Sequence, residues 1–64
     1  MRFQIQYLDN PIIDRPKYAK GQSFSTLEAA YYAAIRLAQI NGLIVAIRIV
    51  LHHGTYSTEW VAIR

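Results

Sequence analysis

Two consecutive histidines, His52 and His53, are the side chains of this sequence best suited to binding a metal. Adjacent residues of an extended segment point to opposite sides, so the two imidazole rings would diverge rather than share one ion. The chain has no cysteine, and no third ligand stands at a recognisable metal-site spacing. The sequence therefore predicts no metal and no cofactor, and the histidines are interpreted as polar residues at the end of a hairpin.

Residues 20–23, Lys-Gly-Gln-Ser, precede a predicted helix start, where backbone N–H groups could receive a phosphate. A phosphate-binding loop requires the order GxxxxGK[S/T] after a strand, and this segment does not match it. The serines stand in no nucleophile-elbow motif. Among the carboxylates, Glu28 and Glu59 are assigned structural roles, in a helix cap and in a cross-strand ion pair. We therefore predict a protein that is not an enzyme and has no catalytic residue.

The loop 15–20 carries three cations and one aromatic ring, a mixture that suits phosphate contact combined with base stacking. A fourth cation, on the outer face of the predicted helix, could extend this patch. Seven Lys and Arg against four Asp and Glu give a net charge of +3, which permits contact with nucleic acid without requiring it. One functional hypothesis is therefore nucleic-acid binding, through Arg15, Lys17, Tyr18, Lys20 and Arg36.

The strands that would position these side chains follow from hydrophobic periodicity. Residues 2–8 alternate between apolar and polar, which predicts a strand with one buried face. Residues 43–52 are apolar on both sides except at Arg48 and predict a central strand, and residues 55–63 predict a third strand. The intervening residues 9–23 show no pattern and are interpreted as a long connecting loop.

The helix has a clear predicted beginning and end. Ser25 and Glu28 have the spacing of a capping box, in which the serine hydroxyl accepts a backbone N–H and the glutamate reaches back. An alanine-rich run with helical periodicity follows and extends to about Ile40. One face of this helix carries Leu27, Ala30, Tyr31, Ala34, Leu37 and Ala38. Asn41-Gly42 then supplies the stop. The helix should cover one face of a sheet.

The order of these elements is β-α-β-β, and residues 1–64 are interpreted as a single α+β domain. A right-handed crossover would make the first two strands parallel, and a hairpin would add an antiparallel third strand. The predicted fold is a three-stranded mixed sheet with one helix packed on one face. Because the chain is short, lacks disulfides and is 53% hydrophobic, oligomerisation is the expected remedy for its small core.

A two-residue turn at 53–54 would fix the pairing of the last two strands, so that Arg48 faces Glu59 and Ile47 faces Trp60. The face that carries Ile47 and Trp60 then packs on the helix. The second face carries aliphatic side chains around one ion pair and needs a cover, either the loop 9–23 or a second chain. The predicted self-association surface is Ile44, Ala46, Arg48, Val50, Glu59, Val61 and Ile63.

The leading functional interpretation is a small non-catalytic interaction module, an adaptor or regulator, that forms a homodimer through this second face and could also bind another protein. Nucleic-acid binding through the loop 15–20 and Arg36 is the alternative. The lack of cysteine suits a reducing cytosol, and no segment has the pattern of a signal peptide. The longest charge-free stretches are too short to span a bilayer, so we expect a cytoplasmic protein without membrane association. The identity of a partner is not contained in the sequence.

Overall fold

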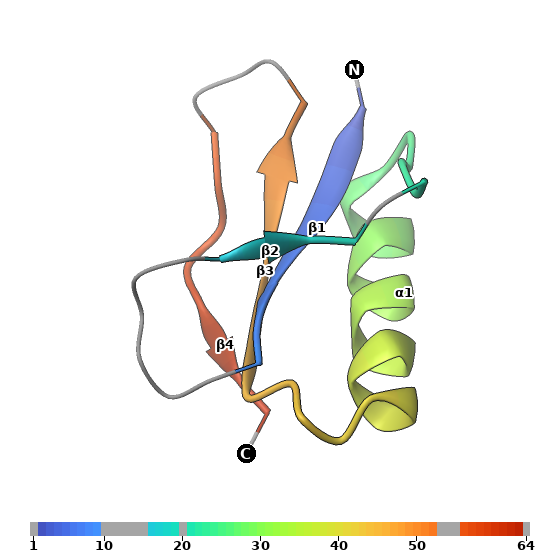
Figure 1. The fold of residues 1–64 in the computed structure, drawn as a ribbon. Helices are drawn as coiled ribbons and strands as arrows, with labels where there is room; N and C mark the ends of the chain where they lie inside the picture. The colour runs from blue at the N-terminus through green and yellow to red at the C-terminus, as the bar shows by residue number, and fades with distance from the viewer. Residues whose placement is uncertain (1, 10–15, 20, 53–55, 64) are drawn as a thin grey trace.

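The structure, a computed structural model, describes residues 2–9, 16–19, 21–52 and 56–63. These ranges contain a single α-helix and a sheet (Figure 1). The elements in chain order are β1 (Phe3–Leu8), β2 (Lys17–Tyr18), α1 (Leu27–Ile40), β3 (Ala46–Leu51) and β4 (Val61–Ala62).

The sheet has four strands in the order β2-β1-β3-β4, and every neighbouring pair is antiparallel. The predicted α+β class is confirmed. The predicted three-stranded mixed sheet is wrong in two respects: β2 is an additional strand, and β1 and β3 are antiparallel rather than parallel. Both differences originate in the segment that the sequence indicated only as a loop.

This segment returns along the outer edge of β1 before the helix begins. The Ala19 N–H donates to the carbonyl of Ile5 over 3.0 Å, and Phe3 and Phe24 exchange backbone hydrogen bonds of 2.7 and 2.9 Å. As a result, α1 starts at the end of the sheet where β1 starts, and β3 begins where β1 ends (Figure 1). The crossover rule describes two parallel strands whose connection runs once along the length of the sheet. The connection from β1 to β3 runs along the sheet twice, first back beside β1 through β2 and then forward through α1, so β1 and β3 are antiparallel.

The helix begins one residue later than the capping box predicted. Thr26, in an extended conformation, is the N-cap, and its hydroxyl accepts the Ala29 N–H over 3.2 Å. The predicted cap at Ser25 is therefore wrong, although the predicted helix start lies within one residue of the observed start. At the other end, the Asn41 N–H donates to the carbonyl of Leu37 over 2.8 Å.

The hydrophobic core lies between α1 and the central strands β1 and β3. Its helix side is formed by small side chains at four-residue spacing, so the helix backbone can approach the sheet closely. Four isoleucines from β1, β3 and the segment just before β3 fill the space between these alanines and the sheet, and all four are fully buried. The core cluster comprises Ile5, Ala30, Ala34, Ala38, Ile44, Ile47 and Ile49.

The register of the last two strands changes along their length. Val50 pairs with Ser57, as the predicted turn requires, but Ile47 pairs with Val61 rather than with Trp60. Residues 58–60 therefore stand opposite residues 48–49, with one extra residue, as in a β-bulge. Because one residue of slip exchanges the two faces of a strand, the predicted helix-facing position of Trp60 is wrong.

Three apolar residues assigned to the second face lie on the helix side instead. Ile44 precedes β3, in a turn where alternation does not apply, and it is fully buried in the core. Val61 pairs with Ile47, whose side chain faces α1. Ile63 is partly buried against the same core cluster. The aliphatic second face inferred from the sequence is thus divided between both sides of the sheet.

Candidate functional site

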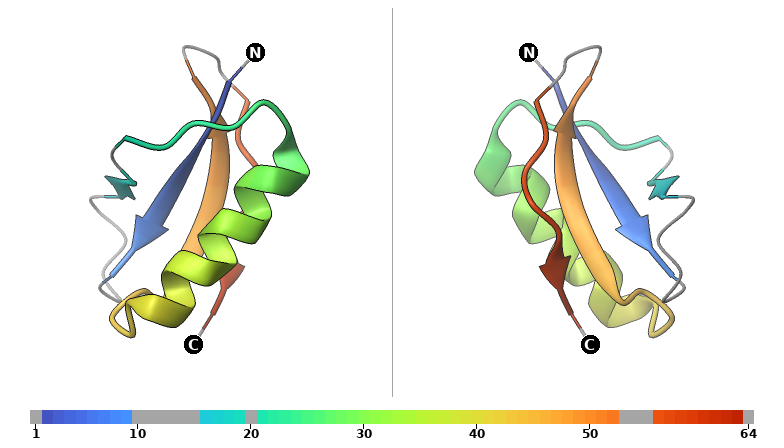
Figure 2. Two further views of the ribbon diagram at one scale, coloured as in Figure 1. Left: turned by 90° about the vertical axis from the view of Figure 1, so that its right-hand side faces the viewer. Right: turned by 90° about the vertical axis from the view of Figure 1, so that its left-hand side faces the viewer.

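Among the described residues, no helix lies over one face of the sheet. Viewed from one side, α1 lies across β1 and β3, and from the opposite side the strands face the viewer with the helix behind them (Figure 2). We call this second side the helix-free face. Residues Gln4, Gln6 and Leu8 of β1 pair with Val50, Arg48 and Ala46 of β3 on this side.

A row of four side chains crosses the helix-free face from one edge of the sheet to the other. Tyr18 of β2 pairs with Gln6 of β1, and Gln6 pairs with Arg48 of β3. The row ends at Trp60, whose ring lies under the Arg48 guanidinium with 4.5 Å between Cζ and the ring centroid. Two aromatic rings therefore flank one amide and one cation.

Arg48 is held in position from two sides. Its Nε donates a 2.6 Å hydrogen bond to Oε1 of Gln6, and its guanidinium stacks over Trp60. Gln6 is buried, and among the described residues this guanidinium makes no other hydrogen bond. The terminal nitrogens of an arginine fixed in this way can donate to an incoming anion, and the planar fork suits phosphate.

Further polar side chains lie near the start of β1. Nδ1 of His52 is 3.1 Å from Oε1 of Gln4, a geometry in which the ring nitrogen donates to the amide oxygen. Nη1 of Arg2 donates to Oγ of Ser23 over 3.2 Å. Arg2 and His52 are exposed and adjoin across β1 and β3, since the His52 N–H donates to the Arg2 carbonyl.

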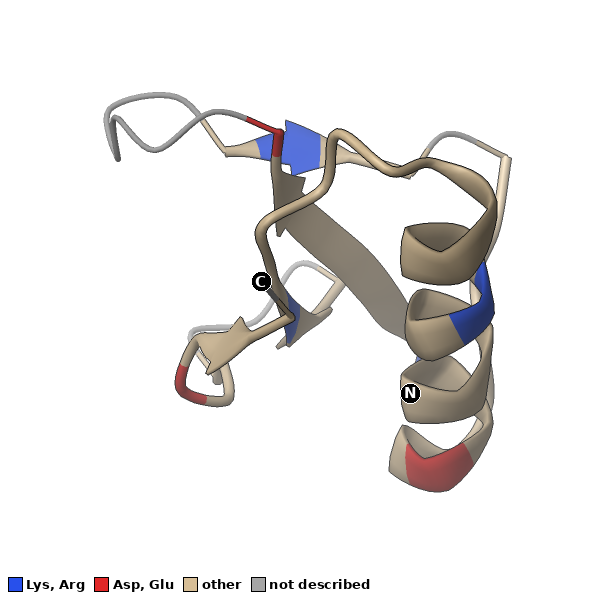
Figure 3. Cartoon of the chain, turned by 90° about the horizontal axis from the view of Figure 1, so that it is seen from below, with Lys and Arg blue, Asp and Glu red and all other residues tan. Residues whose placement is uncertain are grey.

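Charged residues are spread over the sheet and the helix (Figure 3). Within the described part of the chain, Lys17 Nζ and Asp9 Oδ2 form an ion pair over 2.7 Å. The hydrogen bond from Lys17 holds the pKa of the Asp9 carboxyl below its ordinary value, and the same bond raises the pKa of the Lys17 ammonium. Arg48 and Glu59, which are both described, form no ion pair, so the predicted cross-strand ion pair is wrong.

Among the residues predicted to contact nucleic acid, the three that the structure describes lie on different parts of the molecule. Tyr18 is on the row across the helix-free face, whereas Lys17 is paired with Asp9. Arg36 is exposed on α1, in the other layer of the molecule. Arg15 and Lys20 lie outside the described residues.

The predicted self-association surface is also divided. Ala46, Arg48 and Val50 lie on the helix-free face, and both apolar members are already buried within the single chain. Glu59 is exposed within the bulge. The other three members, Ile44, Val61 and Ile63, lie on the helix side of the sheet as described above.

Two residues of the row, Gln6 and Trp60, were not predicted as site residues. Gln6 alternates with apolar neighbours, a pattern that indicates only a face pointing away from the core. Its pairing with Arg48 requires β1 and β3 to be antiparallel, and the stacking of Trp60 requires the bulge. Neither is encoded in short-range periodicity.

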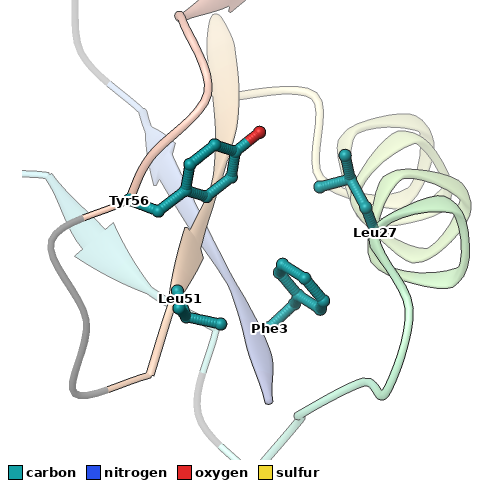
Figure 4. A pocket seen from close by; sticks show the side chains of 4 residues that line it. All are labelled: Phe3, Leu27, Leu51 and Tyr56. Atoms are coloured by element: carbon teal, nitrogen blue, oxygen red, sulfur yellow. The ribbon is translucent and has the colours of Figure 1, made fainter. Parts of the chain in front are cut away.

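An apolar hollow of about 340 Å³ opens on the helix side of the sheet, between the start of α1 and the C-terminal segment. Leu27 and Tyr56 stand on either side of it, with Phe3 and Leu51 between them (Figure 4). The lining offers apolar contact and one phenol hydroxyl. It brings together no acid, base and nucleophile that could work as a catalytic set.

No protein-family model matches the chain, and neither a curated protein nor a solved structure matches it. In the ranges that the structure covers, no three His, Asp or Glu side chains gather closely enough to hold a metal ion. His53, one of the two candidate ligands, is outside those ranges. The helix of the described part of the chain lacks the length and apolar character needed to cross a membrane.

Proposed function

We propose that this protein is a small non-catalytic binding module whose helix-free face binds single-stranded nucleic acid. The observation that supports this proposal is the row Tyr18–Gln6–Arg48–Trp60, in which a fixed guanidinium lies between two aromatic rings. Proteins that bind single strands combine cations along the backbone with aromatic side chains on which bases stack. The net charge of +3 also favours binding to the negatively charged phosphate backbone.

The spacing of the row suits a single strand better than a duplex. Tyr18 and Trp60 are separated by three strand spacings, or about 14 Å, so a base on Tyr18 and a base on the Trp60 face opposite Arg48 would be different bases. The bases of a duplex are stacked and paired inside the helix and cannot lie flat on protein rings. Arg48, between the rings, would donate to the intervening phosphate. Because Gln6 and Trp60 already fix its position, little side-chain freedom is lost on binding.

The test uses the intrinsic fluorescence of Trp60, which is the single tryptophan of the chain. We expect oligo(dT) or oligo(U) to quench this fluorescence in a saturable manner at low salt, and a duplex of the same length to bind more weakly. Each exposed base stack contributes about 1–3 kcal/mol, so Tyr18→Ala should weaken binding roughly 5- to 150-fold. Tyr56→Ala is the matched control, because Tyr56 is as exposed as Tyr18 (49% against 50%) but lines the hollow on the helix side.

Arg48→Gln should lower both the affinity and its salt dependence. Loss of one phosphate contact would reduce the slope of log K against log salt by about 0.7 for a single strand. Absence of quenching at low salt, or equal effects of Tyr18→Ala and Tyr56→Ala, would contradict the proposal. Preferential binding of the duplex would show that the rings do not act as stacking platforms.

A further inference from the structure

The outward face of α1 carries an apolar strip that nothing in the described part of the chain covers. Tyr32 is 72% exposed and Ile35 is 44% exposed, although both belong to the central turns of the helix. With Glu28 and Tyr31 they line a hollow of about 390 Å³ on the surface of the molecule. Large apolar side chains grouped in this way mark an interaction surface more often than scattered ones do.

The charges of α1 lie symmetrically around this strip. Glu28 and Arg36 are the two charged residues of the helix, and Tyr32 stands midway between them in the sequence. All three are exposed, and a spacing of four residues places them along one side of the helix. The acidic residue is in the first turn, and the basic residue is about 12 Å further along the axis at 1.5 Å per residue.

We propose that two copies of this chain associate through these helix faces, antiparallel and related by a two-fold axis at Tyr32. This arrangement brings Glu28 of each copy to the level of Arg36 of the other, so two ion pairs flank the apolar strip. A parallel arrangement in register would instead place like charges together. The surface is self-complementary, which is the condition for an isologous dimer.

The size of the surface limits the strength of the dimer. A helix of 14 residues is about 21 Å long and 10 Å wide, so its outer face is well below the roughly 800 Å² per partner of a standard interface. Association is therefore weak and is expected at high-micromolar concentration. The proposal is independent of nucleic-acid binding, because the helix-free face lies in the other layer of the molecule (Figure 2).

The experiment is a charge-reversal series followed by sedimentation up to millimolar protein at low salt. Glu28→Arg and Arg36→Glu should each weaken self-association about tenfold, because attraction becomes repulsion at both pairs of the dimer. The double variant E28R/R36E should restore the parental association. A 1:1 mixture of the two single variants should form a heterodimer, since one copy then carries two cations and the other two anions.

Glu59→Arg is the matched control, because Glu59 is an exposed glutamate outside the helix. It should leave association unchanged. A parent chain that stays monomeric at 1 mM would overturn the proposal. So would single reversals with no more effect than Glu59→Arg, or a double variant that fails to regain association. Tyr32→Ala should weaken the dimer without changing the charge. An unchanged association constant for this variant would show that the apolar strip is not part of the interface.

Discussion

Arg48 is a cation on an otherwise apolar strand, and its surroundings explain how it is tolerated there. Gln6 accepts its Nε hydrogen, and Trp60 covers the guanidinium with its ring. A half-buried charge is costly unless hydrogen bonds and contacts replace part of its hydration. The hydrogen bond to Gln6 uses Nε, so it does not occupy the terminal nitrogens that can donate to an anion. Arg48 is thus stabilised within the fold and is also able to bind an anion.

The ion pair at the end of β1 permits a test of a single side chain. The hydrogen bond from Lys17 lowers the pKa of Asp9 from its ordinary value of 3.8, so Lys17→Met should raise this pKa towards 3.8. Because the pKa is depressed in the folded chain, the contribution of the pair to stability is present above pH 3.8 and is lost as the pH falls through the lower folded value.

An NMR titration of the Asp9 carboxyl carbon measures this shift. Arg36→Met removes a charge on the helix and should leave the titration of Asp9 unchanged. An Asp9 curve that is the same in Lys17→Met as in the parent would mean that the 2.7 Å pair does not persist in solution.

The helix depends on a cap whose position the structure assigns to Thr26. Thr26→Ala removes the acceptor of the Ala29 N–H and should lower the free energy of unfolding by about 1 kcal/mol. Ser25→Ala is the matched control, and a change within about 0.5 kcal/mol is expected because Ser25 is exposed and is not the cap. Denaturant titration distinguishes the two: a larger loss for Ser25→Ala would place the helix start one residue earlier.

The molecule as a whole relies on a small core, so single core residues carry a large share of its stability. At about 0.05–0.15 kcal/mol per residue, a chain of 64 residues has roughly 3–10 kcal/mol in total. Ile47 is fully buried between α1 and the sheet, and Ile47→Ala should cost about 2–5 kcal/mol.

Thermal or denaturant unfolding should therefore show a clearly lower midpoint for Ile47→Ala than for the parent. The matched control is Ile40→Ala, which removes the same atoms from a side chain that is 82% exposed, with an expected change within about 0.5 kcal/mol. If the two substitutions were equally costly, the core would not be centred on β3.

Local patterns in the sequence determined the elements that depend on near neighbours. Alternation predicted β1, helical periodicity predicted α1 with Ala30, Ala34 and Ala38 on its buried face, and the apolar run predicted β3. These features follow from the geometry of one element at a time, because a strand alternates with period two and a helix repeats every 3.6 residues. The α+β class followed directly from them.

Only the tertiary structure decided how the elements pair, and with it the composition of the candidate site. The two residues of β2 are too few to show a period, yet their return along β1 makes β1 and β3 antiparallel and sets Gln6 beside Arg48. The extra residue among 58–60 moves Trp60 to the helix-free face and Val61 to the helix side. Pairing between distant strands and a one-residue bulge are fixed by contacts across the whole fold, which no window of neighbouring residues contains.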